Sequence, residues 1–290
     1  MHTAPFEYHR AESLDDALRL LDQYGDEAKI LAGGHSLIPV MKLRFAQPAH
    51  LIDIRRIPGM GGVREEGDSL IVGALTTYRQ ILESEAVRRR APLLAETAAQ
   101  VGDLQVRNMG TIGGSLAHAD PGADMPATIL ALGATVTVRG PGGERQIAAD
   151  DFFVGFFTSA LAEGEVLTSI RVPGAAARSG SAYEKHPHPA SGYALCGAAA
   201  IVSLGVGGAI ESARVALTGI GSKAARAAGV EQALLGQDGS PATVAAAAAR
   251  AAEGIDLRPD EAGATGYNEN LARVCVKRAV TRALERARSA

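Results

Sequence analysis

Two glycine-rich stretches, about eighty residues apart, constrain this chain more than any other feature. The longer stretch, residues 107–124, carries Gly110, Gly113 and Gly114 within five positions. Glycines so placed let the backbone turn sharply and bring bare N–H groups against an anion. For an isolated Gly-Gly pair, a tight turn between two core elements would be the better explanation. The second stretch of the same kind favours a phosphate-binding role over that simple turn.

This second stretch follows a short apolar run. Residues 29–32 predict a buried strand, which ends in Gly33-Gly34-His35-Ser36 before a segment from Leu37 that suits a helix. Two such turns could close on the two ends of one pyrophosphate, so a dinucleotide is the economical ligand. No Gly-x-Gly-x-x-Gly follows a strand and no Gly-Lys-Ser/Thr is present, so the motifs support neither a Rossmann site nor a P-loop.

The composition and net charge indicate which kinds of molecule this chain binds. The 290 residues, 47% hydrophobic and 21% charged, suit a globular protein of two domains, or of one large domain with an appended module. A net charge of -3 without a basic block argues against nucleic acid and against a membrane surface. No apolar run reaches the ~20 residues of a membrane span, and the N-terminus lacks a signal-peptide pattern. We expect a soluble cytoplasmic protein whose partners are small molecules or other proteins.

The two cysteines, Cys196 and Cys275, lie far apart in the sequence in apolar surroundings. They imply neither a disulfide framework nor a metal cluster, and we expect buried, inert thiols. The motif His186-Pro-His188-Pro looks like a metal site, but its alternating prolines favour an extended loop.

Hydrophobic periodicity predicts mixed helices and strands. A helix capped by Ser13 ends at Gly25, and the composition shift over 174–180 marks a domain boundary. Before that boundary we expect strands at 51–54, 135–139 and 166–172, a hairpin at 62–74, helices between 78 and 101, and a helix at 124–132. After it we expect strands at 198–206 and 213–217, then Ala-rich helices at 229–236, 243–254 and 266–287.

Two long segments carry a family resemblance. Ala32-Gly-Gly-His-Ser36, with its continuation Leu-Ile-Pro-Val-Met-Lys-Leu-Arg-Phe, and residues 105–124 resemble the FAD-binding medium subunit of molybdenum hydroxylases. This family includes aerobic carbon monoxide dehydrogenase and the xanthine dehydrogenase family. The likeness covers nearly the whole chain, and two long motifs in the correct order are far more specific than either alone.

The resemblance implies an α+β chain with a two-subdomain FAD-binding fold of the vanillyl-alcohol-oxidase type and a small C-terminal α+β domain. The implied divisions are 1–55 and 56–175 for the FAD-binding subdomains and 178–290 for the C-terminal domain. The implied cofactor-binding residues are Ala32, Gly33, Gly34, His35, Ser36, Leu37, Thr111, Ile112, Gly113, Gly114, Ser115, Asp124, Leu167, Lys185 and Tyr193.

The same resemblance distributes roles among these residues. The backbone of residues 33–36 would hold the pyrophosphate from one side and residues 111–115 from the other, although Ser115 stands where many relatives carry Asn or Asp. Asp124 would reach the ribityl chain, and Leu167, Lys185 and Tyr193 are weaker flavin contacts. Simpler explanations remain open for three of these side chains: Asp124 as a helix cap, Lys185 as a solvated surface lysine and Tyr193 as a half-buried strand aromatic.

The resemblance also implies an oxidoreductase subunit that performs electron transfer. A large subunit with a molybdenum cofactor would oxidise the substrate, and a small subunit with [2Fe-2S] clusters would pass electrons to FAD on this chain and on to an external acceptor, NAD, quinone or another carrier. The assembly would be a dimer of heterotrimers. Two cysteines are too few for an iron–sulfur cluster here, and no catalytic acid–base pair is evident. Carbon monoxide is the leading substrate; xanthine, aldehydes and N-heterocycles are alternatives.

Two other functions compete with this one. In some oxidases of the same general fold the histidine of a Gly-Gly-His motif is linked covalently to FAD, which would make His35 an attachment point in a stand-alone flavin oxidase. The part of the chain after residue 175 is too small and Ala-rich to cover a substrate. A non-enzymatic nucleotide-binding or assembly module is the second rival.

Overall fold

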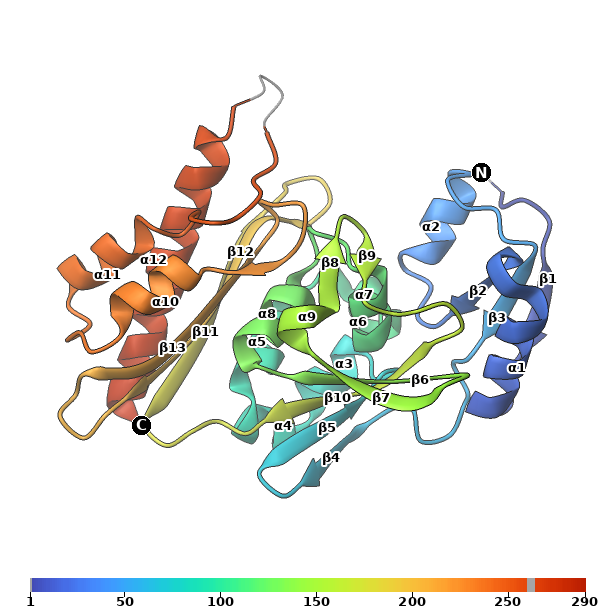
Figure 1. Cartoon of the computed structure of the whole chain (residues 1–290), viewed down its shortest axis with the longest axis horizontal. Helices are drawn as coiled ribbons and strands as arrows, with labels where there is room; N and C mark the ends of the chain where they lie inside the picture. The colour runs from blue at the N-terminus through green and yellow to red at the C-terminus, as the bar shows by residue number, and fades with distance from the viewer. Residues whose placement is uncertain (1, 260–263) are drawn as a thin grey trace.

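The computed structural model describes residues 2–259 and 264–290, and in it three main sheets, each with its own helices, follow one another along the chain (Figure 1). The first is parallel, with order β1-β3-β2, and lies at one end of the molecule. Its elements are β1 (Glu7–Arg10), α1 (Leu14–Tyr24), β2 (Ala28–Leu31), α2 (Leu37–Lys42) and β3 (His50–Asp53), with a 3-10 turn η1 (Gly25–Glu27).

Helix α1 forms where the sequence predicts it. The Ser13 hydroxyl accepts the Asp16 N–H at 3.0 Å, and the helix ends at Gly25, whose φ of 49° is one that other residues rarely adopt. Its apolar face packs on the core formed by the first two sheets. The expected strands at 29–32 and 51–54 are present as β2 and β3.

The edge strand β1 is held to β3 by a polar cluster around Asp53. The Tyr8 hydroxyl donates to Asp53 Oδ2 at 2.5 Å, and the Arg55 guanidinium donates to both Asp53 oxygens. Burial alone would raise the pKa of Asp53, but the hydrogen bonds from Arg55 and Tyr8 outweigh it and hold that pKa at about 2. This cluster keeps β1 in place independently of the other side chains on that strand.

The second sheet is antiparallel, with order β4-β5-β10-β6-β7, and helices cover one of its faces (Figure 1). The expected hairpin at 62–74 and strands at 135–139 and 166–172 are confirmed. Its elements are β4 (Val63–Glu66), β5 (Ser69–Gly73), α3 (Tyr78–Glu83), α4 (Glu85–Arg90), α5 (Pro92–Gln100), α6 (Leu104–Met109), α7 (Ile112–His118), α8 (Asp124–Leu132), β6 (Thr135–Gly140), β7 (Gly143–Ala148), α9 (Ala149–Phe152), β8 (Phe153–Gly155), β9 (Thr158–Ser159) and β10 (Val166–Pro173).

The third sheet, order β11-β12-β13-β14, is antiparallel and packs against the long helix α12. Strand β11 is absent from the sequence-based expectation, because its small and polar residues do not alternate clearly with apolar ones. The elements are β11 (Ser179–Pro187), β12 (Ala194–Leu204), β13 (Ile210–Thr218), β14 (Ala225–Arg226), α10 (Ala228–Leu234), α11 (Pro241–Ala248) and α12 (Gly266–Ser289).

Helix α8 joins the second and third sheets. Nearly every residue of α8 is buried, because α5 contacts it from its own subdomain and β12 and β13 contact it from the C-terminal part. Arg214 of β13 donates to the carbonyls of Leu130 and Ala131 near the end of α8, where a cation is favoured. The first residue of this buried helix is Asp124.

Among the described residues, none of the helices combines the length and apolar character that crossing a membrane requires.

Candidate functional site

The two glycine stretches meet in the folded chain. A Cβ added to Gly33 would lie 2.3 Å from the carbonyl oxygen of Met109 and 2.9 Å from the Cα of Gly110, so the two backbones are in direct contact. A Cβ added to Gly114 would lie 3.9 Å from the Cβ of Ala32. We call residues 32–37 and 110–115 together the glycine junction. Only glycine permits this approach, which explains the residue type at position 33.

The first half of the junction presents unused donors. Strand β2 ends at Leu31 and α2 begins at Leu37, and Gly34 between them has a φ of 77°. The backbone N–H groups of residues 33–36 donate to no acceptor within the part of the chain that the structure describes. Backbone donors need partners, and a run of them in a turn is suited to an anion. A phosphate group fits this chemistry.

The second half of the glycine junction differs from the sequence prediction, in which both glycine turns present free N–H groups to a phosphate. The N–H groups of Ile112 and Gly113 donate to the carbonyls of Thr76 and Ala74 at 3.0 and 2.9 Å. Those of Gly114 and Ser115 donate to Thr111, at Oγ1 and at the carbonyl oxygen, since Thr111 caps α7. The stretch folds as α6 and α7 rather than as an open turn, so the N–H groups of residues 112–115 are consumed. Gly113 is a packing glycine, because a Cβ there would lie 2.6 Å from the Cβ of Ala74.

The second stretch leads to a buried ion pair. Lys185 Nζ lies 2.9 Å from Asp124 Oδ2 and 2.9 Å from the carbonyl oxygen of Gln100, and the Tyr183 hydroxyl donates to Asp124 Oδ1 at 2.6 Å. The Lys185 and Asp124 side chains are only 3% and 5% exposed. Interpreting Lys185 as a solvated surface lysine is therefore wrong. Asp124 is not a cap either: Ala123 occupies the cap position, and the Asp124 carboxylate is bonded to Lys185 and Tyr183.

Burial is the main cause of the pKa shifts in this cluster. It raises the pKa of Asp124, and the Lys185 cation works in the opposite direction. Burial and the Asp124 charge together raise the pKa of Tyr183 well above its usual value, so its phenol stays protonated and donates. An ion pair so deeply buried is costly unless its geometry and extra hydrogen bonds compensate, as the Gln100 carbonyl and the Tyr183 hydroxyl do here.

Tyr183 is the member of this cluster that sequence reasoning missed. It stands two residues before Lys185 on β11, and residues two apart on a strand face the same side. The signal was therefore available once β11 was recognised as a strand. The carboxylate partner lies 59 residues away from Tyr183 and could not be assigned from spacing.

The remaining expected residues have different surroundings. Tyr193 precedes β12 and is 46% exposed, so it is a loop residue and not a strand aromatic. Its ring comes within 3.5 Å of the Cβ position of Gly122, two residues before Asp124 in the sequence. Leu167 is buried on β10 in the core of the first two sheets. Burial raises the pKa of Tyr78, and the nearby Ser115 side chain opposes that rise.

The histidine motif and the cysteines are structural. His186 lies on β11, so the extended loop expected for this motif is wrong for its first half. Beyond the strand, His188 Nδ1 accepts the backbone N–H groups of Ala190 and Ser191 and closes a turn. Both cysteines are free and buried, as expected, but they are neighbours: Cys275 Sγ lies 4.0 Å from the carbonyl oxygen of Cys196.

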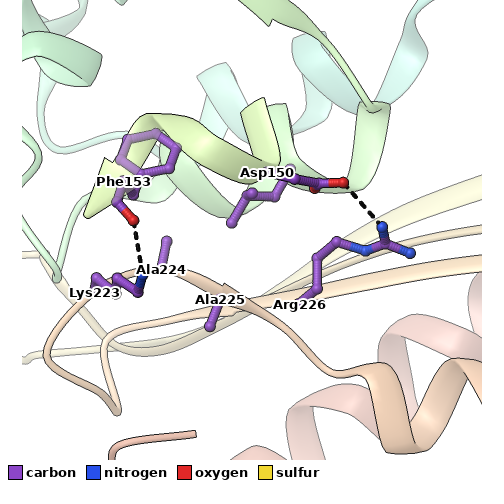
Figure 2. Close-up of a pocket in the computed structure, with 7 residues that line it drawn as sticks. Asp150, Phe153, Lys223, Ala224, Ala225 and Arg226 are labelled. Carbon is purple, nitrogen blue, oxygen red and sulfur yellow. Dashed lines mark hydrogen bonds and ion pairs between the residues drawn. The ribbon is translucent and has the colours of Figure 1, made fainter. Parts of the chain in front are cut away.

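A cavity of about 210 Å³ lies away from the glycine junction, between α9 and β14 (Figure 2). Its charged groups are already paired: Lys223 Nζ donates to the carbonyl of Phe153 at 2.9 Å, and Arg226 forms an ion pair with Asp150 at 3.1 Å. Both side chains therefore have partners within the protein, and these contacts join the second and third sheets.

Comparison with known proteins agrees with this geometry along the whole chain. Residues 4–175 match the family model described as "FAD binding domain in molybdopterin dehydrogenase", and residues 181–283 match "CO dehydrogenase flavoprotein C-terminal domain". The carbon monoxide dehydrogenase medium chain of Hydrogenophaga pseudoflava is 44% identical over 97% of this chain and 98% of its own length. The 6-hydroxypseudooxynicotine dehydrogenase complex subunit alpha of Paenarthrobacter nicotinovorans is 39% identical over 99% of this chain and 97% of its own length.

A solved structure agrees with these sequence matches. A chain of the carbon monoxide dehydrogenase from Hydrogenophaga pseudoflava that lacks the Mo-pyranopterin moiety of its cofactor superposes with a TM-score of 0.95, at 45% identity and with 99% of each chain covered. The expected fold class, a two-subdomain FAD-binding α+β fold with a small C-terminal α+β domain, is confirmed. The expected FAD cofactor and oxidoreductase assignment are confirmed as well. The chain belongs to the family of FAD-binding flavoprotein subunits of the molybdopterin dehydrogenases.

Proposed function

We propose that this chain is the electron-transfer subunit of a molybdenum hydroxylase complex, which takes electrons from the [2Fe-2S] clusters of a small subunit and passes them to an external acceptor. The observation that carries this proposal is the run of N–H groups at residues 33–36, which have no acceptor among the described residues, in a chain whose residues 4–175 match an FAD-binding family. When bound, FAD would supply the redox chemistry, and the protein supplies binding and electrostatics.

For this chain's own residues we propose a division of labour. The N–H groups of Gly33, Gly34, His35 and Ser36, flanked by Ala32 and Leu37, bind the pyrophosphate. Residues 111–115 form the opposite wall through their close packing, since the N–H groups of residues 112–115 are engaged. The buried pair of Asp124 and Lys185 orients the ribityl and ring end, where Tyr193 and Leu167 stand at the periphery.

We propose two partner chains, a large subunit that holds the molybdenum cofactor and a small one that holds the iron–sulfur clusters, assembled as a dimer of heterotrimers. Support comes from relatives that are named as a medium chain or as one subunit of a complex. We also propose FAD-binding subdomains at 1–55 and 56–175 and a C-terminal domain at 178–290, since each of these ranges contains its own sheet. The two free thiols suit the cytoplasm, which is our proposed location.

Carbon monoxide is the substrate we propose for the whole complex, because the carbon monoxide dehydrogenase medium chain matches at 44% identity. The relative at 39% identity is named for a different substrate, 6-hydroxypseudooxynicotine. Substrate choice rests with the large subunit, so this chain supports the class of enzyme more strongly than the substrate.

The test is purification of the complex from its own host through a tag on this chain, followed by flavin and metal analysis. We expect FAD, molybdenum and iron together with one larger and one smaller partner, and copper in addition if carbon monoxide is the substrate. We also expect acid precipitation to release the flavin into the supernatant. A coloured pellet, with neither metals nor partners, would instead support a stand-alone oxidase with FAD attached to His35.

A further inference from the structure

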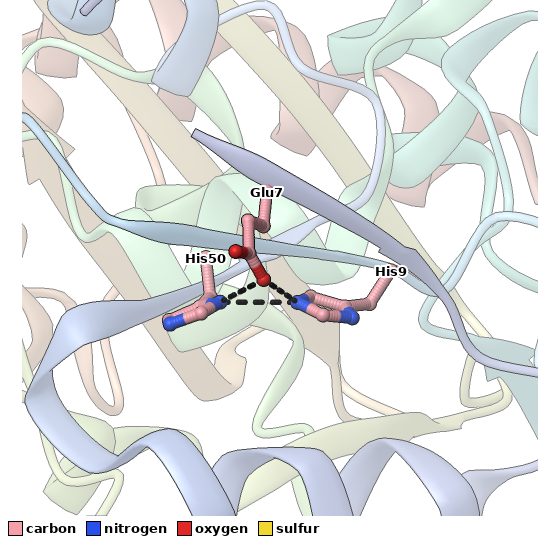
Figure 3. Close-up of side chains that lie close together, drawn as sticks. All are labelled: Glu7, His9 and His50. Carbon is pink, nitrogen blue, oxygen red and sulfur yellow. Dashed lines mark hydrogen bonds and ion pairs between the residues drawn. The ribbon is translucent and has the colours of Figure 1, made fainter. Parts of the chain in front are cut away.

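Three metal-ligating side chains converge on the first sheet, away from the glycine junction (Figure 3). Glu7 and His9 stand two residues apart on β1 and so share one face of that strand. His50 begins the parallel neighbour β3 and pairs with Glu7 in register. We call these three residues the strand triad. The proposed electron-transfer function uses none of them.

The triad has the dimensions of a metal site. His9 Nε2 lies 3.0 Å from His50 Nδ1, and Glu7 Oε2 lies 3.9 Å from the former and 3.6 Å from the latter. A point equidistant from these three atoms, fixed by the three edges of the triangle, lies about 2.1 Å from each of them. That value matches zinc–imidazole and zinc–carboxylate bond lengths, which are about 2.0–2.2 Å.

A hydrogen bond explains only one of the three contacts in the strand triad. One imidazole N–H donating to the other ring explains the contact between His9 and His50. The Glu7 oxygen is too far from both nitrogens for a hydrogen bond, yet it faces both (Figure 3). A cation between the three atoms satisfies all of them at once.

The two imidazoles are oriented by a neighbouring aromatic ring. Tyr24, at the end of α1, stacks on His50 with a centroid distance of 3.7 Å and an interplanar angle of 15°, and on His9 at 4.9 Å. The histidine side chains are 21% and 14% exposed, while Glu7 is 73% exposed. The two histidine nitrogens therefore lie close to the protein surface. The Glu7 side of the triad faces solvent and is open to a water ligand.

We propose that the strand triad binds one divalent transition-metal ion of the zinc class, with His9, His50 and Glu7 as protein ligands and water completing the shell. Two imidazoles and one carboxylate suit zinc, nickel or copper far better than calcium or magnesium, which prefer oxygen. The ion joins the edge strand β1 to β3. No part of the glycine junction belongs to the triad, so the ion takes no part in the proposed FAD binding.

The test uses the full chain with His2, His186 and His188 replaced by alanine, so that these other histidines do not contribute binding. In this background we expect one zinc per chain by calorimetry at micromolar concentration. His50→Phe retains an aromatic ring to stack on Tyr24 but removes the ligand, and should weaken binding by at least about a hundredfold, because even outer-sphere changes cost 10–100-fold. Glu7→Gln, which keeps size but removes the charge, should weaken it by about tenfold or more.

A second readout separates ligation from folding. With copper as probe, the electron paramagnetic resonance spectrum of the background chain should show coupling to two nitrogens, and that of His50→Phe coupling to one. Circular dichroism should be unchanged, since the Asp53 cluster still holds β1 to β3. Absence of zinc binding by the background chain, or equal zinc affinity of background and His50→Phe, would overturn the proposal.

Discussion

Replacing Gly114 by valine is expected to abolish FAD retention while the chain still folds. A Cβ at this position would meet only the Thr111 hydroxyl at 2.8 Å and the Cβ of Ala32 at 3.9 Å, with no backbone in the way. Displacing a capping hydroxyl costs about 1 kcal/mol of stability. The branched side chain would nevertheless intrude between the two halves of the glycine junction. We expect FAD per chain, measured in the complex purified through this chain, to fall by at least about tenfold, equivalent to ~1.4 kcal/mol of binding.

The matched control is the same substitution at Gly142, where an added Cβ meets nothing within 4 Å. It lies in the turn between β6 and β7 and should leave the flavin content unchanged. Full flavin occupancy in Gly114→Val would remove residues 110–115 from the proposed FAD site. A chain that no longer folds would instead show that Gly114 is needed for packing.

Replacing Lys185 by methionine is expected to destabilise the chain by about 3–5 kcal/mol, because it leaves the buried Asp124 carboxylate without its cation. The measurement is the free energy of unfolding from urea titration. Burial already raises the pKa of Asp124, so a protonated carboxyl is tolerated in the folded state. Removing Lys185 raises that pKa further, and the folded state then gains stability as pH falls through it. The destabilisation should therefore shrink from pH 7 toward acid pH.

Two controls accompany this substitution. Lys277→Met changes an exposed lysine of α12 and should shift stability by no more than about 0.5 kcal/mol. Adding Asp124→Asn to Lys185→Met removes the unpaired charge and should recover most of the loss. Equal stability of Lys185→Met and wild type would contradict a buried ion pair at this position.

Local signals predicted much of the fold. Ser13 with its following apolar periodicity predicted α1, and the expected helix at 124–132 is α8 residue for residue. Helix capping and hydrophobic periodicity depend on residues within one or two helical turns. A single sequence is therefore enough to recognise them. The family resemblance of the two glycine motifs supplied the FAD-binding fold, which the comparisons confirm.

Long-range pairing set the limit of sequence reasoning. The burial of Lys185 depends on Asp124, 61 residues earlier, and no local pattern links the two. The N–H groups of Gly113 and Ile112 are consumed by Ala74 and Thr76, which the glycine spacing could not reveal. The strand triad arises only because β1 and β3 pair in parallel at Glu7 and His50. In each case the partner is chosen by tertiary packing.

The most direct test of the proposed electron-transfer function is to monitor flavin reduction by absorption spectroscopy under anaerobic conditions. The two samples are the purified complex and this chain alone, loaded with FAD. Carbon monoxide, an aldehyde and a purine are added in turn to each. We predict that at least one of them bleaches the flavin of the complex and that none bleaches the flavin of the isolated chain, because electrons arrive only through the partner subunits. Reduction of the isolated chain by any of these substrates would contradict it.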